Sequence, residues 1–206
     1  MKVHIDTYGC RTNLADSSLL ARELAQHGMV LSTSVDEVDV VVVNSCTVTH
    51  GADRDAGKAL RRARKANPGA LLVLVGCIPA AYPEHKVLGF ADVVVVGNRP
   101  DDVVEALNAH AQAHAHGHGE RQGFVLEEVH NLSRANIKIG EGCDEGCAYC
   151  IVPRARGRPV SRPLDVVLGD VAAAVEAGFS EGVLTGTHVA KYGKERNPST
   201  NLGGLM

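Results

Sequence analysis

Apolar side chains in the first half of the chain gather in short runs rich in valine and leucine. Four of these runs have the length and composition of strands: residues 2–7, 38–43, 71–75 and 92–96. Three other stretches have leucines or charged groups near helical spacing: residues 13–27, 52–66 and 100–115. Near-continuous β-branched runs are typical of strands buried on both faces of a parallel sheet. Because the runs alternate with helical stretches, we predict a doubly wound parallel-sheet α/β domain over residues 1–115.

A small, polar segment follows this domain. Residues 109–123 read AHAQAHAHGHGERQG and carry four histidines: His110, His114, His116 and His118. Histidine-rich tracts bind metal in some proteins, but short polar segments are also typical of interdomain linkers. We interpret residues 116–135 as a linker.

The last part of the chain returns to the alternating pattern. A strand, a helix and a second strand are predicted at residues 136–139, 164–177 and 182–185, which together make one βαβ unit. A complete β/α barrel needs about 200 residues or more, and the chain ends at residue 206. We therefore expect residues 136–206 to form only the start of such a barrel, and the sequence to be part of a longer protein.

Composition and charge exclude several classes of protein. The chain has 21 Lys and Arg against 24 Asp and Glu, so any contact with nucleic acid requires a local basic patch. Three Phe, four Tyr and no Trp argue against a face of stacked aromatics for single-stranded RNA. No apolar run approaches the roughly 20 residues of a membrane helix, and the N-terminus lacks the pattern of a signal peptide. We expect a cytoplasmic protein with no membrane partner.

Six cysteines carry the strongest chemical signal. In a reducing compartment, cysteines are more often metal ligands or catalytic thiols than disulfides. Cys143, Cys147 and Cys150 have the spacing C-x-x-x-C-x-x-C, which places three thiolates around one small inorganic centre. Three ligands are one short of the usual four, so a position stays open for a substrate or cosubstrate. The alternative is a zinc loop or a set of reactive thiols.

The other three cysteines each follow a predicted strand. Cys10, Cys46 and Cys77 end the segments IDTYGC, VVVVNSC and LLVLVGC. Because the carboxyl ends of parallel strands share one edge of the sheet, these residues can converge on one point. Gly9 and Gly76 precede two of them and permit a tight backbone turn at a crowded site. Three buried structural thiols are the alternative interpretation.

Together these motifs resemble the radical S-adenosylmethionine methylthiotransferase family. The resemblance rests on TYGCRTN, on NSCTVT with ADR following it, on GC at Cys77 and on the later C-x-x-x-C-x-x-C. It covers essentially the whole chain, which has the N-terminal domain of the family and the beginning of its radical domain. The residues around the first cysteines are most similar to the branch that acts on N6-threonylcarbamoyladenosine in tRNA. Asn13 and Asn44 lie in these motifs, and the sequence assigns them no chemical role.

The resemblance implies an enzyme with two [4Fe–4S] clusters. One cluster would be held by Cys143, Cys147 and Cys150 and would bind S-adenosyl-L-methionine, with Tyr149 beside the cofactor. The second would be held by the other three cysteines and would carry the sulfur. The implied reaction adds a methylthio group to C2 of the modified adenosine, and it needs a reducing electron donor and a sulfur source. We expect the 206 residues to have little or no activity by themselves.

Several alternatives stay open. Other branches of the family act on isopentenyladenosine in tRNA or on a ribosomal-protein aspartate. A different radical reaction, or a non-catalytic metal-binding α/β module with zinc, would also fit part of the pattern. Two basic segments, residues 53–65 and 151–163, suit a tRNA partner, and an ordinary solvated helix face is the alternative for the first. We predict nucleic-acid contacts for Arg154, Arg156 and Arg158, and holding the cosubstrate is their alternative role.

Overall fold

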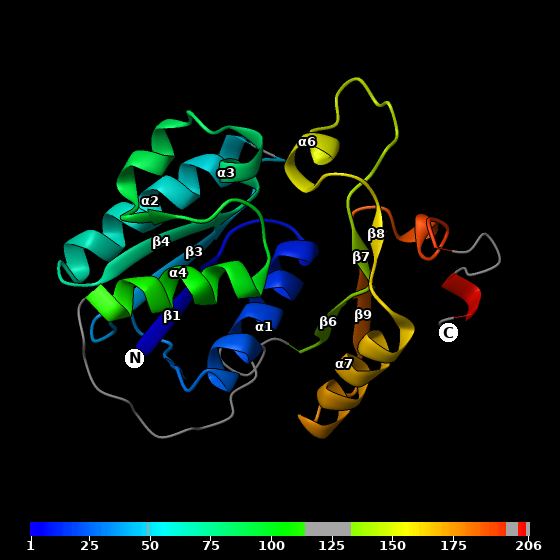
Figure 1. Ribbon diagram of the computed structural model, residues 1–206, viewed down its shortest axis with the longest axis horizontal. Helices are drawn as coiled ribbons and strands as arrows, with labels where there is room; N and C mark the ends of the chain where they lie inside the picture. Colours follow the sequence, from blue (N-terminus) through cyan, green and yellow to red (C-terminus); the bar gives the residue numbers. More distant parts are fainter. Residues whose placement is uncertain (49, 114–132, 197–201, 205–206) are drawn as a thin grey trace.

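The computed structural model describes residues 1–48, 50–113, 133–196 and 202–204. Residues 1–113 form a five-stranded parallel sheet with the strand order β2-β1-β3-β4-β5 (Figure 1). Its strands are β1 (Lys2–Thr7), β2 (Val30–Leu31), β3 (Val40–Ser45), β4 (Leu71–Gly76) and β5 (Val93–Val94). Its helices are α1 (Arg11–Gln26), α2 (His50–Ala66), α3 (Cys77–Ala81), η1 (Lys86–Phe90) and α4 (Pro100–Ala113).

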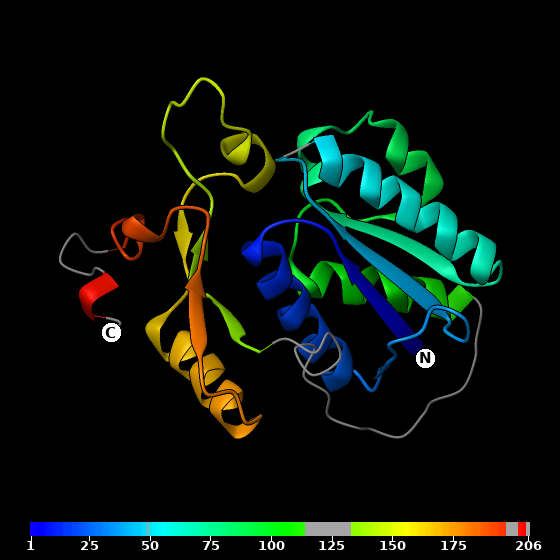
Figure 2. The same cartoon turned by 180° about the vertical axis from the view of Figure 1, so that it is seen from behind.

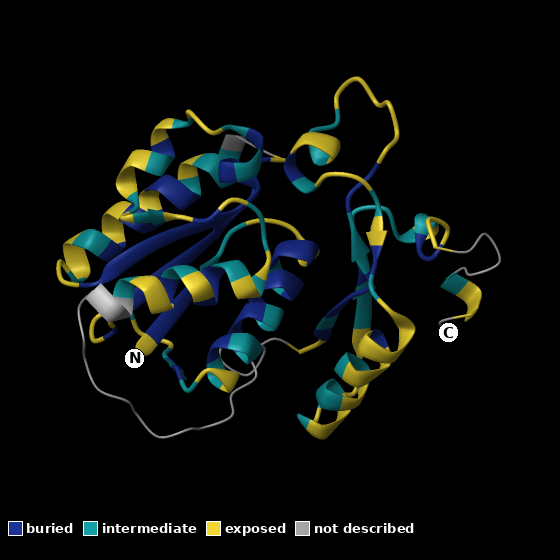
Figure 3. Cartoon of the chain, in the orientation of Figure 1, coloured by how far each residue is buried: buried dark blue, intermediate teal, exposed yellow. Residues whose placement is uncertain are grey.

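Both faces of this sheet are buried, as the valine-rich strands predict. All six residues of β3 and all six of β4 are buried, and alternate side chains point to opposite faces. On one face, Val40 and Val42 pack with α1 and α4. On the other face, Val41 and Val43 pack with Leu60 of α2. Helices on both faces confirm the doubly wound α/β domain, and Figure 3 shows its strands as the main buried layer.

A smaller unit follows the residues that are not described. It contains β6 (Ala135–Lys138), β7 (Gly140–Glu141), α6 (Val152–Arg156), β8 (Val160–Ser161), α7 (Leu164–Glu176) and β9 (Gly182–Thr185). Two 3-10 turns, η2 (Val189–Lys191) and η3 (Leu202–Gly204), come last. Strands β6 and β9 are parallel and α7 connects them, which confirms the predicted βαβ unit. Strands β7 and β8 form an antiparallel pair.

The two units pack against each other through α1. This helix lies between the five-stranded sheet and the β6–β9 pair in both views (Figures 1 and 2). Its inner face packs on the sheet through Leu20 and Leu24. Near its first turn, the Thr12 hydroxyl lies 3.5 Å from the Thr185 hydroxyl of β9. Helix α1 is therefore covered on two sides.

Some expected features lie outside the described residues. His114, His116, His118 and almost all of the linker predicted at residues 116–135 fall there, so the domain boundaries stay a prediction. Across the part of the chain that the structure describes, no helix is long and apolar enough to span a membrane.

Candidate metal centre at the sheet edge

Three cysteines lie where strands of the five-stranded sheet end. Cys10 caps the N-terminus of α1 after β1, Cys46 directly follows β3, and Cys77 is the first residue of α3 after β4. Strands β1 and β3 are neighbours, and their following helices leave to opposite faces of the sheet. Ligand sites in open α/β sheets lie at such a switch point, beyond the carboxyl ends of the strands.

The three thiols lie close together, with Cys46 beside both of the others. The Cys46 thiol and burial together raise the pKa of Cys10 to about 12. On the other side, a hydrogen bond with Cys46 lowers the pKa of Cys77 to about 7, aided by the nearby Arg156 cation and opposed by burial. Cys46 and Cys77 are buried, whereas Cys10 is exposed. The sequence-based expectation that these residues converge therefore agrees with the structure, and the group has one open side.

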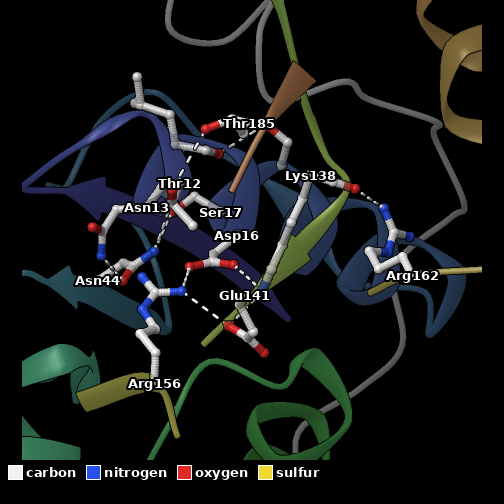
Figure 4. A network of polar contacts seen from close by, with 12 residues as sticks. Thr12, Asn13, Asp16, Ser17, Asn44, Lys138, Glu141, Arg156, Arg162 and Thr185 are labelled. Carbon is white, nitrogen blue, oxygen red and sulfur yellow. Dashed lines mark hydrogen bonds and ion pairs between the residues drawn. The ribbon is translucent and has the colours of Figure 1, made fainter. Parts of the chain in front are cut away.

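A pair of buried asparagines holds the loops that carry two of these cysteines. The Cys10 thiol donates to Asn13 Oδ1 at 3.3 Å. Asn13 Nδ2 donates to Asn44 Oδ1 and to the Ser45 carbonyl, both at 3.1 Å. In return, Asn44 Nδ2 donates to the Asn13 carbonyl at 3.0 Å and to Ser17 Oγ at 2.9 Å. The amide pair ties the start of α1 to the end of β3, and Figure 4 shows the two side chains facing each other.

Glycine is required immediately before Cys10. Gly9 has a φ of +143°, and a Cβ added there would lie 2.4 Å from Cys46 Cβ. Gly76 before Cys77 has a φ of +109°, and its Cβ would lie 2.2 Å from the Ser45 carbonyl oxygen. Gly9 thus leaves room for the Cys46 and Asn13 side chains, and Gly76 leaves room for the backbone of Ser45.

The substitution Gly9→Ala is expected to lower the free energy of unfolding by about 2–4 kcal/mol, from backbone strain and overpacking together. Gly28→Ala is the matched control, because Gly28 also has a positive φ, +76°, but a Cβ there would meet nothing within 4 Å. The control should lose only about 1–2 kcal/mol. Urea unfolding of the metal-free chain measures both losses, and equal losses would contradict a steric constraint at the cysteines.

The second set of cysteines lies on the loop between β7 and α6. Cys143 is buried, Cys150 is half-buried and Cys147 is exposed. The Cys143 amide donates to the Gly157 carbonyl at 3.0 Å, which closes the base of the loop. Tyr149 is 92% exposed at the outer part of the loop. Among the described residues, no group of three or more His, Cys, Asp or Glu side chains is arranged to hold a metal ion. The ligand roles of both cysteine sets stay predictions.

A buried ionic network joins the two units beside the first set of cysteines (Figure 4). Asp16 of α1 accepts from Lys138 Nζ and from Arg156 Nη1, each at 2.6 Å. Glu141 accepts from the same two cations at 2.8 and 3.1 Å. Burial raises the pKa of the Glu141 carboxyl, but Lys138 and Arg156 outweigh it and hold that pKa below its ordinary value. The two carboxylates and two cations balance each other.

Arg156 also reaches the cysteines. Its Nε donates to Cys77 Sγ at 3.2 Å, and its side chain is only 3% exposed. The pKa of Arg156 is raised, because the charges of Asp16 and Cys77 outweigh burial. The sequence suggested nucleic-acid contact for this residue, but the structure places it in the interface between the two units. The sequence analysis did not single out Asp16, Lys138 or Glu141. The one sign of this ionic network was Asp16, a charged residue on the buried face of α1.

The other two arginines predicted to contact nucleic acid are accessible. Arg154 is exposed, with its guanidinium 5.0 Å from the centre of the Tyr82 ring, and Arg158 is exposed two residues after Arg156. Some basic residues of helix α2 contact other parts of the fold instead of pointing only into solvent. Its Arg61 lies over the Phe90 ring and its Arg62 donates to the Tyr8 hydroxyl at 3.1 Å.

Comparisons with known proteins agree with this architecture. Residues 2–97 match the family described as "Uncharacterized protein family UPF0004". Threonylcarbamoyladenosine tRNA methylthiotransferase MtaB of Aquifex aeolicus is 33% identical over 205 residues, which are 95% of this chain and 50% of that protein. A tRNA-2-methylthio-N(6)-dimethylallyladenosine synthase of Fervidobacterium nodosum is 32% identical over 212 residues, which are 100% of this chain and 49% of that protein. The chain thus spans about half the length of these relatives.

A solved structure supports the fold beyond the first domain. The radical S-adenosylmethionine methyltransferase TsrM from Kitasatospora setae, with cobalamin and a [4Fe-4S] cluster bound, superimposes with a TM-score of 0.61. The match covers 90% of this chain and 49% of that protein at 14% sequence identity, so it speaks for the fold alone.

The chain therefore shares its α/β architecture with TsrM over 90% of its length. A doubly wound domain is followed by a second, smaller parallel unit. Over nearly its whole length the chain is similar in sequence to methylthiotransferases, and its residues 2–97 match the UPF0004 family.

Proposed function

We propose that this chain is the cluster-bearing part of an iron–sulfur enzyme that adds a methylthio group to C2 of N6-threonylcarbamoyladenosine in tRNA. One observation carries the proposal: Cys10, Cys46 and Cys77 follow three neighbouring strands at the carboxyl edge of one sheet, with Cys46 beside the other two thiols. The similarity to methylthiotransferases adds the type of reaction. The 206 residues correspond to about half of such enzymes, and we expect little or no turnover from them alone.

The chemistry of the first set of cysteines fits an iron–sulfur cluster. Thiolates are the usual protein ligands of such clusters, and three of them leave one iron free for another group. Cys77 lies beside a buried guanidinium, which stabilises the thiolate over the thiol. Cys10 is exposed, so the centre would be open on that side to incoming sulfur. We propose that this site holds the sulfur-carrying [4Fe–4S] cluster.

The second set would hold the other [4Fe–4S] cluster through Cys143, Cys147 and Cys150. When bound, that cluster and S-adenosyl-L-methionine supply the one-electron chemistry that activates the adenine C2–H bond. The loop is anchored in the fold, because Lys191 of η2 pairs with Asp144 and, at 2.7 Å, with Glu145. Tyr149 is free to contact the cofactor from the outer part of the loop.

The expected partner is tRNA, in the cytoplasm, with a reducing electron donor and a sulfur source. Arg154 and Arg158 are exposed next to the cysteine loop and would contact phosphates there. Arg156 is buried and paired, so we propose no phosphate contact for it.

A second substrate is nearly as well supported. The dimethylallyladenosine synthase from Fervidobacterium nodosum is 32% identical to this chain, against 33% for the threonylcarbamoyladenosine enzyme. The motifs TYGCRTN and NSCTVT, which surround Cys10 and Cys46, favour the threonylcarbamoyladenosine branch.

Comparison of tRNA nucleosides from cells with and without the gene that encodes this chain tests the proposal. Mass spectrometry should show that the 2-methylthio form of threonylcarbamoyladenosine disappears and the unmethylthiolated form accumulates. Loss of the 2-methylthio form of isopentenyladenosine instead would assign the second substrate. If neither nucleoside changes, the proposed reaction on tRNA is wrong. Re-expression of the intact gene is the control.

A further inference from the structure

The Arg156 guanidinium touches both carboxylates of the interface and one cysteine of the sheet edge. Its Nη1 donates to Asp16 at 2.6 Å and to Glu141 at 3.1 Å. Its Nε donates to Cys77 Sγ at 3.2 Å. Its Nη2 is buried and has no hydrogen-bond partner among the described residues. One nitrogen is thus held by anions, one faces sulfur, and one lacks an acceptor.

The free nitrogen lies on the same edge of the guanidinium as the one that faces sulfur. The guanidinium is planar, and its Nε–H and one Nη2–H point in the same direction, as in side-on pairing with a carboxylate. A buried N–H without an acceptor costs about 1–3 kcal/mol. An anionic group bound next to Cys77 would supply that acceptor. The arrangement is therefore suited to a larger anionic sulfur centre than the Cys77 thiolate alone.

The network fixes the direction of this edge. Asp16 is 2% exposed and holds Nη1 from the side of α1, and Glu141 holds it from the end of β7. Lys138 bonds to the same two carboxylates, so Arg156 does not have to neutralise both. Rotation of the guanidinium away from Cys77 would break two charge-assisted hydrogen bonds.

We propose that Arg156 is a positioning residue for the cluster held by Cys10, Cys46 and Cys77, with its Nε–Nη2 edge donating hydrogen bonds to the Cys77 sulfur and to an adjacent sulfur of that cluster. The proposal rests on the proposed function. Arg156 ends α6, six positions after Cys150, so the residue that completes the first site is delivered by the segment that carries the second.

The expected consequence is electronic. Hydrogen bonds to cluster sulfurs and a nearby positive charge stabilise the reduced, more negative state of a cluster. Removal of the Arg156 guanidinium should therefore make the reduction potential of this cluster more negative. A residue that only held the two units together would leave the potential of a cluster that still binds unchanged.

The test uses the full chain with Cys143, Cys147 and Cys150 changed to alanine, so that one cluster remains after anaerobic reconstitution with iron and sulfide. Three further variants are compared in this background: Arg156→Gln, Arg156→Lys and the control Arg158→Gln, which alters an exposed arginine two positions away. Iron and sulfide per chain are measured first, and the potential is then followed by electron paramagnetic resonance during redox titration.

We expect about four irons in every variant. The potential should be most negative in Arg156→Gln, intermediate in Arg156→Lys, which retains the charge, and unchanged in Arg158→Gln. An unchanged potential in Arg156→Gln overturns the inference and leaves the proposed function standing. If Arg156→Gln binds no iron, the Arg156→Lys variant becomes the test. A reduction potential of Arg156→Lys equal to that of the parent then overturns the inference. If the parent itself binds no iron, the proposed function and this inference both fail.

Discussion

Changing Cys143, Cys147 and Cys150 together to alanine is expected to lower the iron content of the reconstituted chain from about eight to about four atoms. The acid-labile sulfide should fall in the same proportion. The physical reason is that the two sets of cysteines lie on different elements, the β7–α6 loop and the sheet edge. Loss of one set removes its ligands and leaves the other set in place. Colorimetric iron and sulfide assays, with protein quantified by amino-acid analysis, measure this.

The complementary variant is the matched control. Changing Cys10, Cys46 and Cys77 to alanine should also halve the iron, and changing all six cysteines should abolish binding. A fall from about four irons to none in the first variant would mean a single cluster, and a different radical reaction would then replace methylthio transfer. Stoichiometric zinc without iron would instead favour a metal-binding module.

Asp16→Ala is expected to lower the free energy of unfolding by about 3–5 kcal/mol, the cost of removing one partner from a buried ion pair. Asp16 is 2% exposed, and its removal leaves Lys138 and Arg156, which are 8% and 3% exposed, with a single carboxylate between them. Chemical denaturation in urea measures the loss.

The exposed residue Glu37 offers a control for this variant, because Glu37→Ala should change stability by no more than about 0.5 kcal/mol. Comparable losses in the two variants would mean that the network contributes little to the interface. A separate early transition in Asp16→Ala, seen by one probe only, would mean that the smaller unit detaches before the sheet unfolds.

The central strands β3 and β4 of the first domain could be predicted because burial on both faces leaves no polar alternation. The run VDVVVV requires a central strand of a parallel sheet, and β3 occupies that position. The strands β2, β7 and β8 could not be predicted, since each has only two residues and no distinctive composition. The short helices α3 and α6 contain Pro79 and Pro153, which give no periodic signal over five residues.

The convergence of Cys10, Cys46 and Cys77 could also be predicted, because the position of a residue after a parallel strand determines its place on the sheet edge. The ionic network could not. Lys138 and Arg156 are 122 and 140 positions from Asp16 along the chain, so only the packing of the two units brings them together. For the same reason, the burial of Arg156 was not evident from its basic neighbours.

The placement of α1 between two layers has an evolutionary consequence. Residues that share one buried network do not contribute independently, and a change at one of them alters the effect of a change at another. Asp16, Lys138 and Arg156 form such a set across the interface. Among related sequences, positions 16 and 138 are expected to covary: a lineage that loses the carboxylate at position 16 should also have replaced the cation at 138. The buried residues of α1 would then limit which sequences of the second unit can pack against the first domain.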